Sequence, residues 1–210
     1  MNANGITSAG NASTWLKHHT ATIALHWASA LLFLAAAATI LVRELVEDSA
    51  IRTLLVESHR QVGMLVLAAW VARLVVRSIK GMAHTEAGMS LPMRIAAKGA
   101  HYALYALILA IPMLGWALSN AHGVQLKFLG MLPLPMITAA DSDFADTLTD
   151  YHILVSWALL VMVTLHIGAA LYHHYVRRDQ VLSAMLPGKA TADGQTDAVN
   201  EGRCDDAIAA

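Results

Sequence analysis

The stretch YHILVSWALLVMVTLHIGAALYHHYV, at residues 151–176, decides the class of this protein. It contains no acidic residue, lysine or arginine, and it is longer than the roughly 20 apolar residues that a helix needs to cross the hydrocarbon core of a bilayer. The stretch therefore predicts a transmembrane helix. It also holds His152 and His166, and ionisable side chains inside a membrane are costly and usually functional.

Three further stretches of the same kind lie at about residues 20–42, 58–79 and 99–118. Lipid offers the backbone no hydrogen-bond partners, so each span should be helical, and Pro112 predicts a kink in the third. The 210 residues are 57% hydrophobic and 14% charged, whereas a soluble domain carries about a quarter charged residues. We expect an all-α membrane protein, a four-helix transmembrane bundle at residues 1–186, followed by a disordered polar tail at 187–210.

The basic residues predict the orientation of the spans. Seven flank the first and fourth spans or lie around the connection between the second and third: Lys17, Arg77, Lys80, Arg94, Lys98, Arg177 and Arg178. The other side has four basic residues (Arg43, Arg52, Arg60, Lys127) against eight acidic ones (Glu44, Glu47, Asp48, Glu57, Asp141, Asp143, Asp146, Asp150). The positive-inside rule then places both termini in the cytoplasm.

Composition also excludes several functions. A net charge of −1 implies no bulk attraction to nucleic acid. The only cysteine, Cys204, allows neither an intrachain disulfide nor a thiolate cluster, and neither a phosphate-binding glycine motif nor a nucleophile elbow occurs. Redox chemistry would therefore need a cofactor that other side chains hold.

Histidine is the residue in excess, with 11 in the chain. His152 and His166 are 14 residues apart, so they share a helix face at about 21 Å along the axis. That spacing suits two stacked cofactors, each with a second imidazole at the same depth on another span. His26 matches His166 on the cytoplasmic side, and His59 matches His152 on the outer side. Because bundles build cofactor sites from facing helices, these pairs predict two haem b groups with bis-histidine iron ligation.

Other readings of the histidines compete with this one. A lone membrane histidine often makes an interhelical hydrogen bond, and His59 and His152 lie where interfacial anchors are common. A haem-free transporter that uses histidines as a pathway is a third possibility, but relays usually include an intramembrane carboxylate, and here every carboxylate lies in a loop, a tail or at a helix end. Gly63, Gly115 and Gly168 suit either a flat macrocycle or plain helix packing.

An ordered set of motifs resembles the bacterial cytochrome b561 family of four-helix di-haem membrane cytochromes. The motifs are LHW at 25–27, ESHRQVG at 57–63, AHYALYALILAIPMLG at 100–115, YHILVSW at 151–157, LHIGAALYHHY at 165–175 and DQVLSAMLP at 179–187. The resemblance implies the same ligand pairs, the bacterial inner membrane and electron transfer with ubiquinone. It is strongest to the superoxide oxidase branch, and so implies an enzyme that takes electrons from superoxide at the outer face.

Two electron donors stay open within this family. Superoxide is an anion, so its oxidation predicts that Arg43, Arg52, Arg60 or Lys127 cluster around the outer haem and offset the acidic loops. The alternative is a cytochrome b subunit onto which a periplasmic hydrogenase or dehydrogenase docks.

The remaining polar residues of the spans supply candidates for the quinone and the haem propionates. His173 lies two turns beyond His166 on the same face and is expected to hydrogen-bond a quinone oxygen and deliver a proton; the alternative is an interfacial anchor among aromatic residues. The propionate or pocket candidates are His101, Arg73, Arg77 and Lys98, and no chemistry is assigned to His18, His19, His84 or His122.

Overall fold

The structure, a computed structural model, describes residues 20–80, 90–179 and 181–186. Four long helices dominate it: α1 Thr20–Leu45, α2 Ser49–Lys80, α3 Leu91–Ala121 and α4 Ser142–Tyr172. The last continues as one π-helical segment, η1 His173–Arg177, and a short 3-10 helix, η2 Ser183–Met185, follows. All four long helices are long and apolar enough to cross a membrane, which confirms the expected all-α four-helix bundle.

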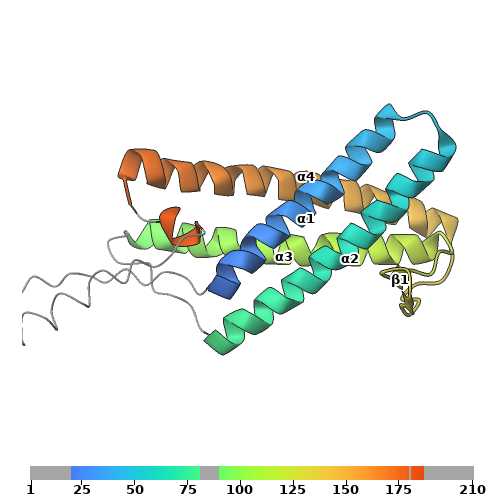
Figure 1. Ribbon diagram of the computed structural model, residues 1–210, viewed down its shortest axis with the longest axis horizontal. Helices are drawn as coiled ribbons and strands as arrows, with labels where there is room; N and C mark the ends of the chain where they lie inside the picture. Colours follow the sequence, from blue (N-terminus) through green and yellow to red (C-terminus); the bar gives the residue numbers. More distant parts are fainter. Residues whose placement is uncertain (1–19, 81–89, 180, 187–210) are drawn as a thin grey trace, which may run out of the picture.

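The helices form two antiparallel pairs, α1 with α2 and α3 with α4, which cross each other at an angle (Figure 1). The connections α1–α2 and α3–α4 lie together at one end of the bundle, here called the loop end. The start of α1, the end of α2, the start of α3 and the end of α4 lie at the opposite end, here called the terminal end. Placement of the terminal end in the cytoplasm stays a prediction from the basic residues.

Three helices begin well before the apolar spans expected from the sequence, at Ser49, Leu91 and Ser142. Two of these extensions are capped by carboxylates, which pair with backbone N–H groups that a helix start leaves free. Asp48 accepts from the amides of Ala50 and Ile51 at 2.8 and 3.0 Å, and Asp141 accepts from that of Phe144 at 3.0 Å. Polar helical turns therefore extend beyond the hydrocarbon core.

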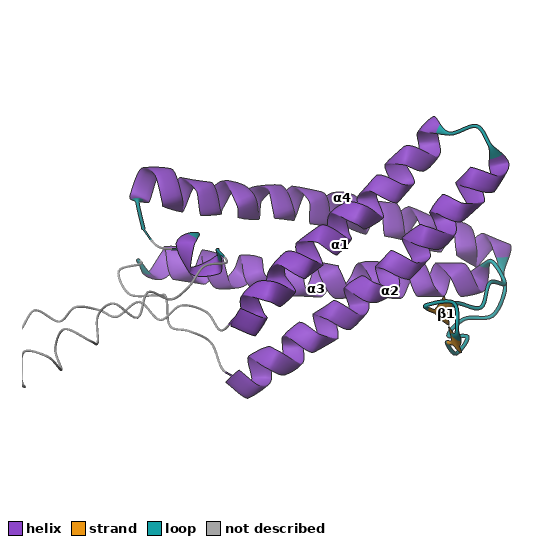
Figure 2. Cartoon of the chain, in the orientation of Figure 1, coloured by secondary structure: helices purple, strands orange, loops and turns teal. Residues whose placement is uncertain are grey.

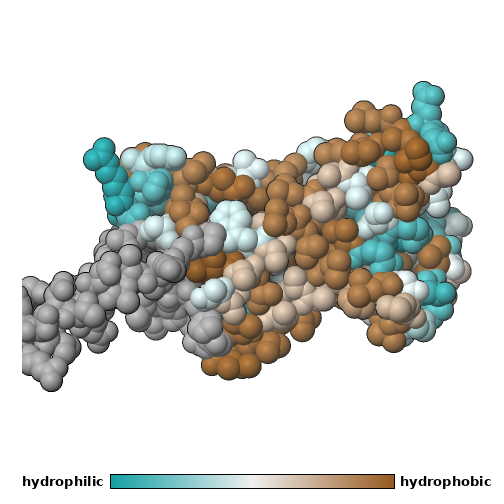
Figure 3. All heavy atoms as spheres, in the orientation of Figure 1, coloured by the Kyte–Doolittle hydropathy of each residue, from teal (hydrophilic) through white to brown (hydrophobic). Residues whose placement is uncertain are grey.

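The bundle has its apolar side chains on the outside. Leu31, Leu34 and Leu41 along α1 are each more than 60% exposed, as are Leu154 and Leu165 on α4. Brown, hydrophobic atoms accordingly cover most of the face seen in Figure 3, with hydrophilic atoms gathered towards the two ends. This is the surface of a protein that is solvated by lipid.

The loop end is ordered by buried polar contacts. Asn120, fully buried at the end of α3, donates to the carbonyl of Val124 and accepts from the amide of Ile137, at 3.0 and 2.9 Å. Between these points lies a two-stranded hairpin, β1 Lys127–Phe128 and β2 Leu132–Pro133 (Figure 2). Gln61 of α2 holds it with two side-chain hydrogen bonds, to the Lys127 carbonyl and from the Leu129 amide, both at 2.9 Å.

At the terminal end the chain turns back over α1. The indole N–H of Trp27 donates to the carbonyl of Met185 at 2.8 Å, across 158 residues of sequence. This contact ties η2 to the helix that carries His26.

Candidate functional site

Two pairs of histidines face each other across the bundle, and α4 supplies one member of each. Near the loop end, the rings of His59 on α2 and His152 on α4 have centroids 6.2 Å apart with planes at 82°. Near the terminal end, the rings of His26 on α1 and His166 on α4 have centroids 6.4 Å apart at 59°. The structure therefore brings together the pairs that depth-matching predicted.

These separations suit a metal ion between the two rings. A metal–imidazole bond of about 2.0 Å on either side, with about 1.2 Å from each nitrogen to its ring centre, puts the centroids of a linear pair about 6.4 Å apart. Both pairs lie within a few tenths of an ångström of that value. Direct ring packing, in contrast, brings His101 and His166 to 5.4 Å, which leaves too little room for the same arrangement.

The backbone fixes the orientation of His59. Its Nδ1 lies 2.9 Å from the carbonyl oxygen of Ala36 on α1, and the hydroxyl of Thr39 lies 3.4 Å away. Since a carbonyl only accepts, Nδ1 carries the proton and Nε2 keeps its lone pair. Metal-binding histidines are characteristically held in this way by an outer hydrogen bond.

Its partner His152 is held by shape. A Cβ on Gly115 of α3 would lie 3.3 Å from Cε1 and 3.7 Å from Nδ1 of His152, so only glycine leaves the ring its present position without displacement. At Gly63 and Gly168, one turn or less from His59 and His166, a Cβ would meet nothing within 4 Å. The backbone next to His59 on α2 and next to His166 on α4 therefore has open space beside it.

The pair near the terminal end has a cationic neighbour. Nη2 of Arg73 lies 3.1 Å from Nδ1 of His26, and because arginine only donates, Nδ1 accepts here. The guanidinium groups of Arg73 and Arg77 both lie over the ring of Tyr105, at 5.6 and 5.2 Å from its centroid. A neutral His26 that accepts at Nδ1 carries its proton on Nε2, so metal binding through Nε2 would need the other tautomer and a different partner for Arg73.

Of the weaker candidates, His101 packs against His166, while Lys98 is an exposed side chain on α3. His173 begins the π-helical segment, and its Nδ1 lies 2.5 Å from Oδ2 of Asp179. Sequence reasoning missed Asp179 because the contact depends on a chain reversal after α4. His122 is exposed at the end of α3, whereas Lys17, His18, His19, His84, Cys204 and the tail at 187–210 lie outside the described residues.

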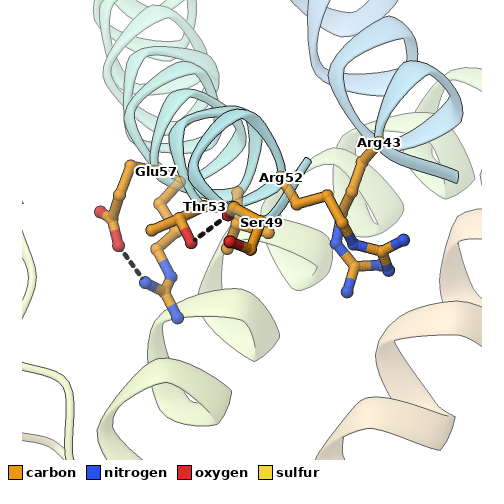
Figure 4. A pocket seen from close by; sticks show the side chains of 7 residues that line it. Arg43, Ser49, Arg52, Thr53 and Glu57 are labelled. Atoms are coloured by element: carbon orange, nitrogen blue, oxygen red, sulfur yellow. Dashed lines mark hydrogen bonds and ion pairs between the residues drawn. The ribbon is translucent and has the colours of Figure 1, made fainter. Parts of the chain in front are cut away.

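The loop end carries a pocket with a positive lining. It has a volume of about 410 Å³ and is formed by the end of α1 and the first turns of α2: Arg43, Ser49, Arg52, Thr53, Val56, Glu57 and Arg60. The lining contains three arginines and one glutamate. Glu57 pairs with Arg60, Arg43 pairs with the neighbouring Glu44, and Figure 4 shows Arg43 and Arg52 pointing toward one another. Arg60 directly follows His59 in α2, so the cluster includes the residue next to one member of the loop-end pair.

A four-helix bundle with an apolar surface and two facing pairs of histidines is the arrangement expected of a membrane cytochrome b. Comparison with known families agrees: the model of prokaryotic cytochrome b561 matches residues 17–188. The chain belongs to the prokaryotic cytochrome b561 family, whose members are haem b proteins of electron transport in bacterial membranes.

Three curated relatives are similar to it. Cytochrome b561 homolog 2 of Escherichia coli (strain K12) is 33% identical over 140 residues, 65% of this chain and 72% of the relative. Cytochrome b561 homolog 1 of the same organism is 31% identical over 173 residues, 79% of this chain and 94% of the relative. The probable superoxide oxidase CybB of Yersinia pestis is 37% identical over 89 residues, 42% of this chain and half of the relative.

Proposed function

We propose that this protein is a di-haem superoxide:ubiquinone oxidoreductase of the bacterial inner membrane. The observation that carries the proposal is the geometry of the two histidine pairs. Each pair has one member on α4, and each has the ring separation that suits an iron bound between two imidazoles. His59 and His152 would hold one haem b, and His26 and His166 the other. When bound there, haem supplies one-electron redox chemistry at a centre without an open coordination position.

The residues of the chain prepare these sites. The Ala36 carbonyl keeps the proton of His59 on Nδ1, so that Nε2 remains the ligand atom. Gly115 leaves room for the ring of His152. Arg73 and Arg77 place two positive charges beside the terminal-end pair, where they can balance propionate carboxylates.

The pocket of Arg43, Arg52 and Arg60 supports superoxide as the electron donor. The loop-end connections are acidic as a whole, but three arginines line this pocket; Glu57 pairs with Arg60 and Glu44 with Arg43, so the charge of Arg52 remains in excess. A locally positive cleft raises the concentration of an anion and its rate of encounter. Each superoxide ion would leave the pocket as dioxygen after giving up one electron next to His59.

Ubiquinone is the proposed acceptor at the terminal end. Two superoxide ions supply two electrons, ubiquinone takes them up together with two protons, and the products are two dioxygen molecules and ubiquinol. His173 lies two helical turns beyond His166 and has a side chain that is only 13% exposed. Its imidazole can donate a hydrogen bond and a proton to a quinone oxygen.

The first experiment is a haem count followed by donor kinetics. We expect purified protein to contain two haems b per chain, by pyridine haemochrome assay, with six-coordinate low-spin spectra. Stopped-flow mixing with superoxide and ubiquinone-1 should then show haem reduction and ubiquinol formation. No haem in protein that was expressed with ample haem supply would refute the proposal.

The charge of the pocket can be tested with two substitutions that should change the rate of reduction by superoxide in opposite directions. Arg52→Gln should slow reduction by superoxide about two- to tenfold and Glu57→Gln should accelerate it, because each change alters the local field in a different direction. Both effects should shrink as salt screens the pocket. The rate of haem reduction by an uncharged reductant should be the same in both variants as in the parent protein. Equal effects on both donors would contradict the assignment of the pocket to an anion.

A protein donor is the second candidate, and the hairpin at the loop end favours it. Leu129 and Met131 in the turn of the hairpin and Leu132 in β2 have exposed fractions of 53%, 80% and 61%. Gln61 binds the hairpin through two hydrogen bonds, and these exposed side chains would offer an apolar contact for a periplasmic subunit. Co-purification of a periplasmic dehydrogenase or hydrogenase, together with no reaction of the isolated chain with superoxide, would favour this function.

A further inference from the structure

The chain reverses direction where α4 ends, and the reversal returns a carboxylate to the helix. The segment His173–Arg177 is π-helical, and Arg178 adopts a left-handed conformation with φ 53° and ψ 35°. The amide of Asp179 then donates to the carbonyl of His173 at 3.2 Å. As a result the side chain of Asp179 lies against the imidazole six residues before it, with Oδ2 at 2.5 Å from Nδ1.

The carboxylate is held on both of its oxygens. Oδ1 accepts from the amide of Val181 at 3.2 Å, and the guanidinium Nε of Arg177 lies 3.9 Å from Oδ2. Burial favours protonation of Asp179, but the hydrogen bond with His173, the Val181 amide and the charges of His173 and Arg177 outweigh it and lower the pKa of this carboxyl. Asp179 is therefore ionised throughout the physiological pH range.

A carboxylate fixed on Nδ1 determines which nitrogen of His173 is available. Asp179 only accepts, so the Nδ1 proton stays between the two groups and Nε2 becomes the exchangeable position. Among the described residues, Nε2 has no hydrogen-bond partner, and the nearest ring is that of Tyr172 at 6.1 Å between centroids. The other charged group facing the pair is Arg177.

We propose that Asp179 is the positioning residue of proton delivery to the quinone: it holds Nδ1–H of His173 and so makes Nε2 the atom that donates to the quinone oxygen. This inference rests on the proposed function, in which His173 meets the quinone. It adds Asp179, which lies beyond the end of η1 and so outside the membrane spans expected from the sequence.

The proton balance is simple. In the donating state both nitrogens of His173 carry a proton, and the Asp179 carboxylate accepts the one on Nδ1. As the quinone takes up an electron, the Nε2–H bond breaks, an O–H bond forms on the quinone, and His173 becomes neutral with its proton retained on Nδ1. Water at the end of the bundle returns a proton to Nε2, and two such turnovers complete the quinol.

The test compares two variants with two electron acceptors. Asp179→Asn keeps the shape and a hydrogen-bond acceptor but removes the charge, whereas Asp179→Glu keeps the charge and alters the shape. Holoprotein that has been reduced beforehand is mixed with ubiquinone-1, which requires protons, or with ferricyanide, which does not. Haem oxidation is followed by its visible absorption in each case.

We expect Asp179→Asn to slow oxidation by ubiquinone-1 about 10- to 100-fold, which is within the range of general acid catalysis, and to leave oxidation by ferricyanide unchanged. Asp179→Glu should recover part of the quinone rate, and the solvent deuterium isotope effect should grow in Asp179→Asn. A quinone rate within twofold of the parent protein, or equal slowing with both acceptors, would overturn the inference.

A His173→Gln variant tests the role of His173 at the quinone separately from the role of Asp179. If it loses the quinone rate while Asp179→Asn keeps it, His173 meets the quinone but Asp179 has no part in the transfer. If both variants keep the quinone rate, the quinone binds elsewhere, and the proposed role of His173 fails together with this inference.

Discussion

Replacing Gly115 by alanine should weaken one haem site and spare the other. The added Cβ would lie 3.3 Å from Cε1 of His152, whereas carbon atoms in contact are most stable at about 3.5–4.0 Å. The imidazole ring of His152 or helix α3 must then move by a few tenths of an ångström. If His152 binds iron, such a displacement would disturb the bond between its ring nitrogen and the metal. Overpacking of this kind costs about 1–3 kcal/mol, which corresponds to a roughly 5- to 150-fold loss of affinity at the loop-end site.

The assay is the haem content of purified Gly115→Ala, together with a redox titration that resolves the two centres. Haem per chain should fall from two towards one, and the centre that remains should be the one lost in His166→Ala. Gly99→Ala, on the same helix at a position where a Cβ meets nothing within 4 Å, is the matched control and should retain both haems. Two haems with unchanged potentials in Gly115→Ala would refute the reasoning that His152 is a ligand held in place by this contact.

Three further outcomes follow from the geometry. His101→Ala should keep two haems and His26→Ala only one, by pyridine haemochrome assay, because only His26 has the ring separation from His166 that suits a shared iron; the reverse result would reassign the ligand to α3. Trp27→Phe removes the hydrogen bond to the Met185 carbonyl, and the loss of about 1 kcal/mol should make residues 181–186 more accessible to proteases while haem content stays constant; unaltered proteolysis would mean that this contact does not hold the segment. The lowered pKa of Asp179 means that its ionised form stabilises the fold above the ordinary value of 3.8, and this contribution is lost as the pH falls through the lower value of the folded state. The difference in melting temperature between the parent protein and Asp179→Asn should therefore be largest near neutral pH and shrink below about pH 4; a difference independent of pH would exclude a charge effect.

The four helices were predictable because lipid leaves little choice. A long apolar run must satisfy its own backbone, so length and hydropathy were sufficient to place residues 20–42, 58–79, 99–118 and 151–176 in helices. The true starts at Ser49, Leu91 and Ser142 were not predicted, since turns beyond the membrane are polar and their helical state depends on caps such as Asp48 and Asp141.

Depth placed His26 at the level of His166 and His59 at the level of His152, because helices of fixed rise bring residues at equal depth to the same level. Depth did not distinguish His26 from His101, whose ring also lies next to His166. The contacts that orient the rings were not predictable. The Ala36 carbonyl that meets His59 is a backbone atom, which no side-chain pattern can reveal. The Asp179–His173 contact depends on a left-handed residue at Arg178, and nothing in the local composition indicates a reversal there.

Because α4 supplies one histidine to each pair, neither proposed haem site has both of its histidines until the last span has been synthesised. α1 and α2 leave the ribosome with His26 and His59 already in place, but His152 and His166 arrive only with the last span. On this ligand assignment, haem binds only after all four helices have been synthesised. A nascent chain arrested before α4 would therefore hold no haem with two histidine ligands. The haem content of the protein would then indicate whether all four helices have been inserted into the membrane.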